Sequence, residues 1–174
     1  MEASHQAAIY GHAWQASAGS VIGTGGAGGH ELIVPVGPPD PPGLAGVTVD
    51  GTQGFRFTAR GVHVLAPSVK VHMPTSGECR YGKATVGVYL LGGEGDGALV
   101  GYLPGSVDIL TDASLSFTIT AAGPVRPVDG LGLDQAYKVK ASWLWVTEES
   151  PGDDPYADAP TWITYRIDNP GAGT

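Results

Sequence analysis

The chain lacks the features of two large classes of protein. Its 174 residues contain one cysteine, Cys79, which excludes an internal disulfide framework. The five arginines and four lysines are scattered, and the formal net charge is −8. This distribution excludes the basic stripe that nucleic-acid binding requires.

Long apolar segments are also missing. No apolar run approaches the roughly 18 residues that a membrane-spanning helix needs. The first residues, Met-Glu-Ala-Ser-His-Gln, have neither the basic region nor the apolar region of a signal peptide. We therefore expect the protein to be made and to fold in a cytosol.

Turn-forming residues and apolar residues are both abundant. The 28 glycines and 14 prolines make up about a quarter of the chain, a level at which disorder must be considered. Against disorder, 42% of the residues are hydrophobic, and they follow clear two-residue alternations. A turn-rich all-β domain accounts for both observations.

The strongest strand patterns come last, at Tyr137–Thr147 and Thr161–Ile167, and the acidic loop Glu148–Pro160 joins them. Three of the four tryptophans fall in these two segments. Their alternation of β-branched and aromatic residues is typical of half-buried strands. The sequence predicts that they form a hairpin carrying the largest share of the core.

The alternation also assigns faces. Trp143 and Trp145 share one face of the first strand, and Lys138 and Lys140 lie on the other. We expect the tryptophans to point inward. In the second strand the inward set is Ile163, Tyr165 and Ile167, which leaves Trp162, Thr164 and Arg166 on the outer face.

An earlier segment changes its alternation at a glycine. Phe55 and Phe57 are expected inside, and after Gly61 the apolar phase passes to Val62 and Val64, which leaves His63 outside. Such a change predicts a β-bulge in one bent strand. Ala66-Pro67 is expected to turn the chain into the next strand.

The expected organisation is an N-terminal arm followed by one domain. Residues 1–43 form the arm and a Pro-rich linker, with a short strand near residues 31–36, and residues 44–174 form the body. The arm lies either on its own domain or on a neighbouring subunit. About nine to ten short strands separated by turns predict an antiparallel β-sandwich resembling a jelly roll.

No cofactor or catalytic motif in the sequence has the structural context that its chemistry requires. Gly23–Gly28 has the spacing of a dinucleotide fingerprint, but a strand pattern follows where that motif needs a helix. Asp153, Asp154 and Asp158 are candidate Ca²⁺ ligands, with a solvated acidic loop as the alternative. The five histidines form no ligand set. We expect a protein without a cofactor or enzymatic activity.

The candidate binding residues are aromatic or cationic. An exposed Trp162 beside Arg166 would anchor an interface, and Tyr10 and Trp14 would give the arm its contacts. Alternatively, Trp143, Trp145 and Trp162 form a platform for stacking sugars, as in carbohydrate-binding or lectin-like sandwiches. The ring exposure of Trp162, Trp145 and Tyr156 separates these two hypotheses.

In layout and composition the whole chain resembles virion proteins of tailed phages that infect high-GC bacteria, such as head decoration or minor tail proteins. The resemblance rests on the acidic, disulfide-free, all-β pattern with an arm, and on the Gly, Ala, Val, Pro and Asp bias. It implies a β-sandwich that docks on a capsid or tail, associates with itself and other virion subunits, and assembles in the host cytoplasm.

Overall fold

A computed structural model describes residues 9–15, 20–21, 23–25, 29–34, 36, 46–50, 54–73, 78–103, 108–111, 116–126, 133, 135–146 and 156–168. Every regular element in these ranges is a β-strand, and all the pairings are antiparallel. The described ranges contain no helix long and apolar enough to cross a membrane.

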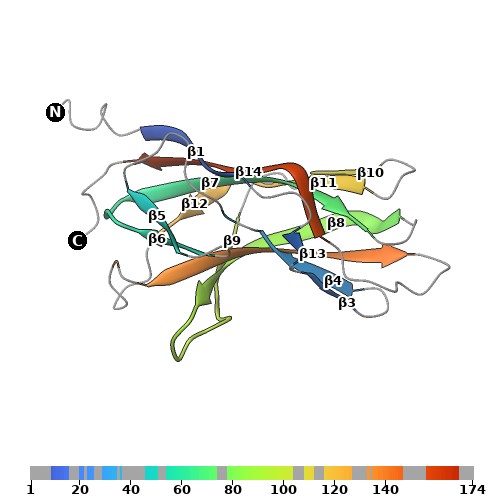
Figure 1. Ribbon diagram of the computed structural model, residues 1–174, viewed down its shortest axis with the longest axis horizontal. Coiled ribbons are helices and arrows are strands. Elements are labelled where there is room, and N and C mark those ends of the chain that lie inside the picture. The colour runs from blue at the N-terminus through green and yellow to red at the C-terminus, as the bar shows by residue number, and fades with distance from the viewer. Residues whose placement is uncertain are drawn as a thin grey trace.

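The strands form two sheets that stack face to face (Figure 1). Sheet A contains β1 (Ile9–Gln15), β2 (Ser20–Val21), β7 (Val62–His72), β10 (Asp108–Thr111), β11 (Ser116–Thr120), β12 (Gly123–Val125) and β14 (Tyr156–Asp168). Sheet B contains β3 (Gly23–Gly25), β4 (Gly29–Ile33), β5 (Val47–Asp50), β6 (Gly54–Phe57), β8 (Glu78–Leu91), β9 (Leu99–Tyr102) and β13 (Ala136–Val146). The expected jelly-roll-like β-sandwich is confirmed.

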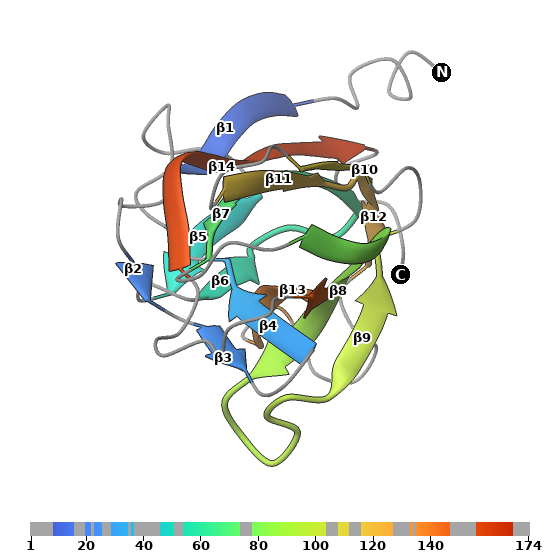
Figure 2. The same cartoon turned by 90° about the vertical axis from the view of Figure 1, so that its right-hand side faces the viewer.

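Strands that are adjacent in a sheet come from distant parts of the chain. In sheet A, β14 lies between β1 and β7, and β7 pairs on its other side with β11 and β12. In sheet B, β13 pairs with β8 along one edge and with β4 and β6 along the other. The chain passes repeatedly from one sheet to the other, as the end-on view shows (Figure 2).

The predicted hairpin of the last two strands is wrong. β13 belongs to sheet B and β14 to sheet A, so these neighbours in sequence pair with different partners. The faces were nevertheless assigned correctly where side chains are described. Trp143 is buried, as are Ile163, Tyr165 and Ile167, because the inward faces of both strands meet in the same core.

The predicted bent strand at Gly61 is also wrong. β6 ends at Phe57 in sheet B, and β7 begins at Val62 in sheet A. The chain crosses between the sheets around Gly61, whose φ of 143° is one that residues with a side chain rarely adopt. β7 then runs through Pro67 without the expected turn.

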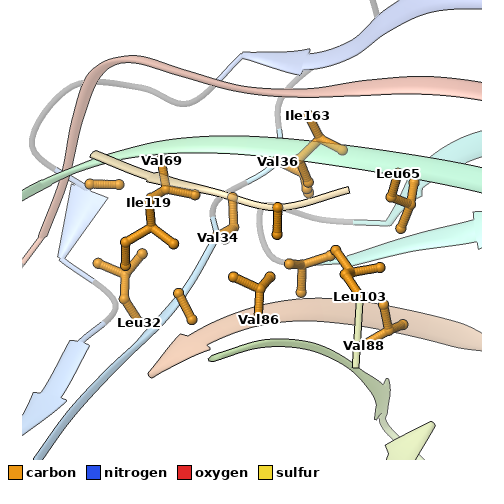
Figure 3. Packing of buried hydrophobic residues seen from close by; sticks show 14 of the residues in the cluster. Leu32, Val34, Val36, Leu65, Val69, Val86, Val88, Leu103, Ile119 and Ile163 are labelled. Carbon is orange, nitrogen blue, oxygen red and sulfur yellow. The ribbon is translucent and has the colours of Figure 1, made fainter. Parts of the chain in front are cut away.

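The core lies between the two sheets. Figure 3 shows Leu65, Val69, Ile119 and Ile163 of sheet A packed towards Leu32, Val86 and Val88 of sheet B. Aromatic rings fill one part of it: Phe57 lies 5.4 Å from Phe55 and 5.1 Å from Tyr137 between ring centroids. Burial of this apolar set is the main source of stability.

Candidate functional site

The outer face of sheet A carries an apolar row on β7. Burial alternates strictly along this strand, so Val62, Val64 and Ala66 face outward and are half-buried. The neighbouring β11 is different, because its outward residues are Ser116, Thr118 and Thr120. One face of an antiparallel sheet is usually polar when it meets water. Over residues 62–66 the outer face of β7 is therefore apolar where a polar face is expected.

The sequence-predicted interface residues border this row. Arg166 of β14 pairs with Val64 and is exposed, and exposed Pro124 pairs with Val64 from the other side. Tyr10 of β1 pairs in turn with Arg166. The backbone register therefore brings Tyr10, Arg166, Val64 and Pro124 into one line across four strands.

The other two predicted residues lie further along the same pair of strands. Trp162 pairs with Gln15 of β1 and with Ser68 of β7, and Trp14 pairs with Ile163. The side chains of Tyr10, Trp14, Trp162, Trp145 and Tyr156 lie outside the described part of the structure. The proposed role of these residues in an interface stays a prediction.

The candidate Ca²⁺ ligands belong to the acidic segment between β13 and β14 and to the start of β14. Asp153 and Asp154 lie outside the described residues. The backbone of Asp158, in β14, pairs with that of Lys70 in β7, and its side chain is outside the described part of the structure. Within the described ranges no three His, Cys, Asp or Glu side chains gather as metal ligands would. The calcium hypothesis remains a prediction.

His63 lies in the core, although the sequence placed it outside. Its Nδ1 is 2.7 Å from the hydroxyl of Tyr165, its Nε2 is 2.8 Å from the carbonyl oxygen of Ala59, and its ring stacks on Phe57 at 3.9 Å. The carbonyl only accepts, so Nε2 carries the proton and the Tyr165 hydroxyl donates to Nδ1. Desolvation lowers the pKa of His63 to about 4, although the bond to Ala59 opposes the shift.

Both ring nitrogens of His63 are thus occupied, and the side chain is fully buried. Burial also raises the pKa of Tyr165 above its ordinary value. A closed pair of neutral groups stabilises a core but cannot exchange protons with a substrate. We assign the pair a structural role.

A second surface, missed in the sequence, lies on the outer face of sheet B. Lys140 Nζ lies 3.1 Å from Glu31 Oε2 and 4.4 Å above the ring of Tyr89. Burial raises the pKa of Tyr89, Lys140 opposes that shift, and Tyr102 and Glu31 add to it. These four residues come from β4, β13, β8 and β9, and we call them the cross-strand row.

Two features extend the cross-strand row. Leu99 of edge strand β9 pairs with Tyr89, so it lies beside the cross-strand row on the same strand as Tyr102. The Nζ atom of Lys138 lies 3.7 Å from Oδ1 of Asp96, a residue of the β8–β9 turn. A hydrogen bond from the Gly92 amide holds the pKa of Asp96 below its usual value, and Lys138 adds to that effect. Sequence alternation placed both lysines outward but could not show these partners.

Comparisons with known proteins yield structural matches alone. No protein-family model matches the chain, and no curated protein matches it. Two crystal structures of murine APRIL, at pH 8.5 and pH 8.0, superpose with TM-scores of 0.48 and 0.49 and identities of 13% and 15%. Each comparison covers 92% of this chain and 98% of the APRIL chain.

Proposed function

We propose that this protein is a non-enzymatic structural subunit that associates with copies of itself through the outer face of sheet A. The observation that carries the proposal is the outward row Val62, Val64 and Ala66 on β7. Exposure of this apolar row to water is unfavourable, and the free energy falls when a second surface covers it.

The surroundings of this apolar row suit a protein partner. Arg166 lies at its edge, and Tyr10 and Trp162 pair into the same region of the sheet. Arginine, tyrosine and tryptophan are the residue types that contribute most to protein interfaces. A second copy is the simplest occupant, because a twofold axis lets one patch serve both partners.

We further propose that the subunit belongs to a tailed-phage virion, as a head decoration or minor tail protein assembled in the host cytoplasm. An acidic chain with one cysteine supports folding in a reducing compartment, since no disulfide is needed. The outer faces of the two sheets give such a subunit two surfaces for lattice contacts. The proposal includes no catalytic role for His63, because both of its ring nitrogens are bonded in the core.

Self-association is tested by size-exclusion chromatography with light scattering. The wild-type chain is expected to elute as an oligomer, and Val64→Glu as a monomer, because burying a carboxylate in an apolar contact carries a desolvation penalty that the neighbouring Arg166 offsets only in part. Thr118→Glu is the matched control: it places the same charge on the same sheet, opposite Lys70 of β7. A monomeric wild type, or an oligomeric Val64→Glu variant, contradicts the proposal.

The virion assignment is tested separately. Particles released from bacteria that carry the gene are purified on a density gradient and analysed by mass spectrometry. The chain is expected at a fixed stoichiometry to the major capsid or tail protein. Its absence from particles would overturn the virion role while leaving self-association intact.

A further inference from the structure

The most exposed large apolar side chains in the described part of the chain both belong to edge strand β9. Tyr102 is 58% exposed and Leu99 is 45% exposed. Both lie on the outer face of sheet B beside Tyr89, because Tyr102 pairs with Gly87 and Leu99 with Tyr89. The β8–β9 hairpin also projects from the body of the sandwich (Figure 2), which leaves this face accessible.

A glycine keeps the surface beside Tyr102 low. Gly87 of β8 pairs with Tyr102, so the outer face carries no side chain of its own at that neighbouring position. At Gly87 the ring of Tyr89 lies where a side chain would be, since a Cβ there would sit 2.8 Å from its Cε2. The result is a shallow aromatic surface formed by Tyr89 and Tyr102.

Charged groups beside this surface are held in fixed positions. The side chains of Lys138 and Lys140 are 13% and 21% exposed, whereas their partners Asp96 and Glu31 are 55% and 45% exposed. The lysines therefore lie against the sheet, and the carboxylates face solvent. Both carboxylates therefore present oxygen atoms to hydrogen-bond donors that approach from solvent.

Within each of these two ion pairs the opposite charges cancel, so the surface offers polar groups without net positive charge. Glu94, exposed in the β8–β9 turn, adds negative charge nearby. An acidic ligand such as a sulfated glycan or a nucleic acid would be repelled by this arrangement. A neutral ligand with many hydroxyl groups matches it.

We propose that the outer face of sheet B binds a neutral oligosaccharide. Tyr102 and Tyr89 stack against the apolar C–H face of a sugar ring, which buries aromatic surface that is otherwise exposed to water. The carboxylates of Glu31 and Asp96 accept hydrogen bonds from sugar hydroxyls, and Lys140 donates one. Leu99 covers the edge of the next sugar unit.

This site is independent of the proposed self-association. The apolar row on β7 belongs to sheet A, and the cross-strand row belongs to sheet B on the opposite side of the sandwich (Figure 1). A glycan can therefore reach sheet B while sheet A contacts a second copy.

The test is titration calorimetry of the full chain with cellohexaose, maltohexaose and chitohexaose, and with heparin as the acidic comparison. At least one neutral hexasaccharide is expected to bind, and heparin is expected to bind more weakly than that sugar. Tyr102→Ala should lower the association constant about tenfold, because the ring supplies the stacking surface. Tyr102→Phe retains the ring and should retain most of the affinity.

Glu31→Gln should also weaken binding, because a carboxylate acceptor is lost. Thr118→Ala on the outer face of sheet A is the control and should bind as the wild type does. Val64→Glu should bind the sugar unchanged even when it is monomeric, which separates this site from the proposed function. The proposal is overturned if no neutral hexasaccharide binds, if heparin binds more tightly, or if Tyr102→Ala binds as tightly as the wild type.

Discussion

The buried pair of His63 and Tyr165 makes the stability of this protein sensitive to mild acid. In the unfolded chain a histidine titrates near its ordinary pKa of 6.5, whereas in the folded core the pKa of His63 is lowered to about 4. Between these two values the unfolded state binds a proton that the folded state does not. Stability contributed by neutral His63 is therefore complete above pH 6.5 and is lost as the pH falls towards 4.

The size of the effect follows from the difference between the two pKa values. One pKa unit corresponds to about 1.36 kcal/mol, so lowering the pH from 7.5 to 4.5 should cost about 2.5 kcal/mol of unfolding free energy. Protonation at Nδ1 also removes the acceptor of the Tyr165 hydroxyl and places a charge against the ring of Phe57.

The comparison protein is the double variant His63→Phe, Tyr165→Phe. This variant removes the hydrogen bond between the two side chains and also takes away the donor of the Ala59 carbonyl, so it should cost about 1–3 kcal/mol at pH 7.5. The single variant Tyr165→Phe leaves Nδ1 without its donor in the core, and should cost about 1–3 kcal/mol at the same pH. Urea unfolding at pH 7.5 and 4.5 measures all three proteins.

Carboxylates titrate in both the wild type and the double variant. The difference between the two proteins in the unfolding free energy lost from pH 7.5 to pH 4.5 therefore isolates the contribution of His63. The wild type should lose about 2.5 kcal/mol more than the double variant between the two pH values. Equal losses in the two proteins would refute the assignment of acid sensitivity to His63.

Two further predictions concern the core. Trp143→Ala should lower the unfolding free energy by about 3–5 kcal/mol, because it leaves a cavity beside His30 and Phe117. Trp143→Phe should cost much less, because the buried indole N–H that it removes has no hydrogen-bond partner among the described residues. Thermal melts of both variants check this, and a mild Trp143→Ala contradicts it. Gly46→Ala should cost about 2–4 kcal/mol, because Gly46 has φ of 89° and its added Cβ would lie 2.6 Å from the Tyr165 hydroxyl. Gly101→Ala, in open space, should stay within about 0.5 kcal/mol in the same melts; equal effects of the two substitutions would contradict the argument.

Sequence alternation predicted the strands and most of their faces, because a two-residue period depends on local residues alone. Phe55, Phe57, Trp143 and Ile163 are buried as expected. Alternation failed at His63, where two outward valines looked like a core pair. His63 can lie in the core because the Tyr165 hydroxyl, 102 positions further along the chain, hydrogen-bonds to its ring. A partner so distant in sequence leaves no local pattern.

Pairing was harder to predict than faces. β13 and β14 have complementary patterns and are neighbours in sequence, which favours a hairpin. Their separation into two sheets depends on long-range partners, β8 for one and β7 for the other. The cross-strand row was missed for the same reason: Glu31, Tyr89, Tyr102 and Lys140 come from four strands that only the sheet order brings together.

The position of β13 has a consequence for the synthesis of the chain. In sheet B this strand joins three hairpins, β3–β4, β5–β6 and β8–β9, and in sheet A β14 joins β1 and β2 to β7. A nascent chain that ends before residue 136 contains the hairpins but neither of the strands that connect them. Such a chain exposes unpaired strand edges and apolar core residues on the ribosome. Both sheets can therefore be completed only after residues 136–168 emerge from the ribosome, and the chain is most prone to aggregate before that point.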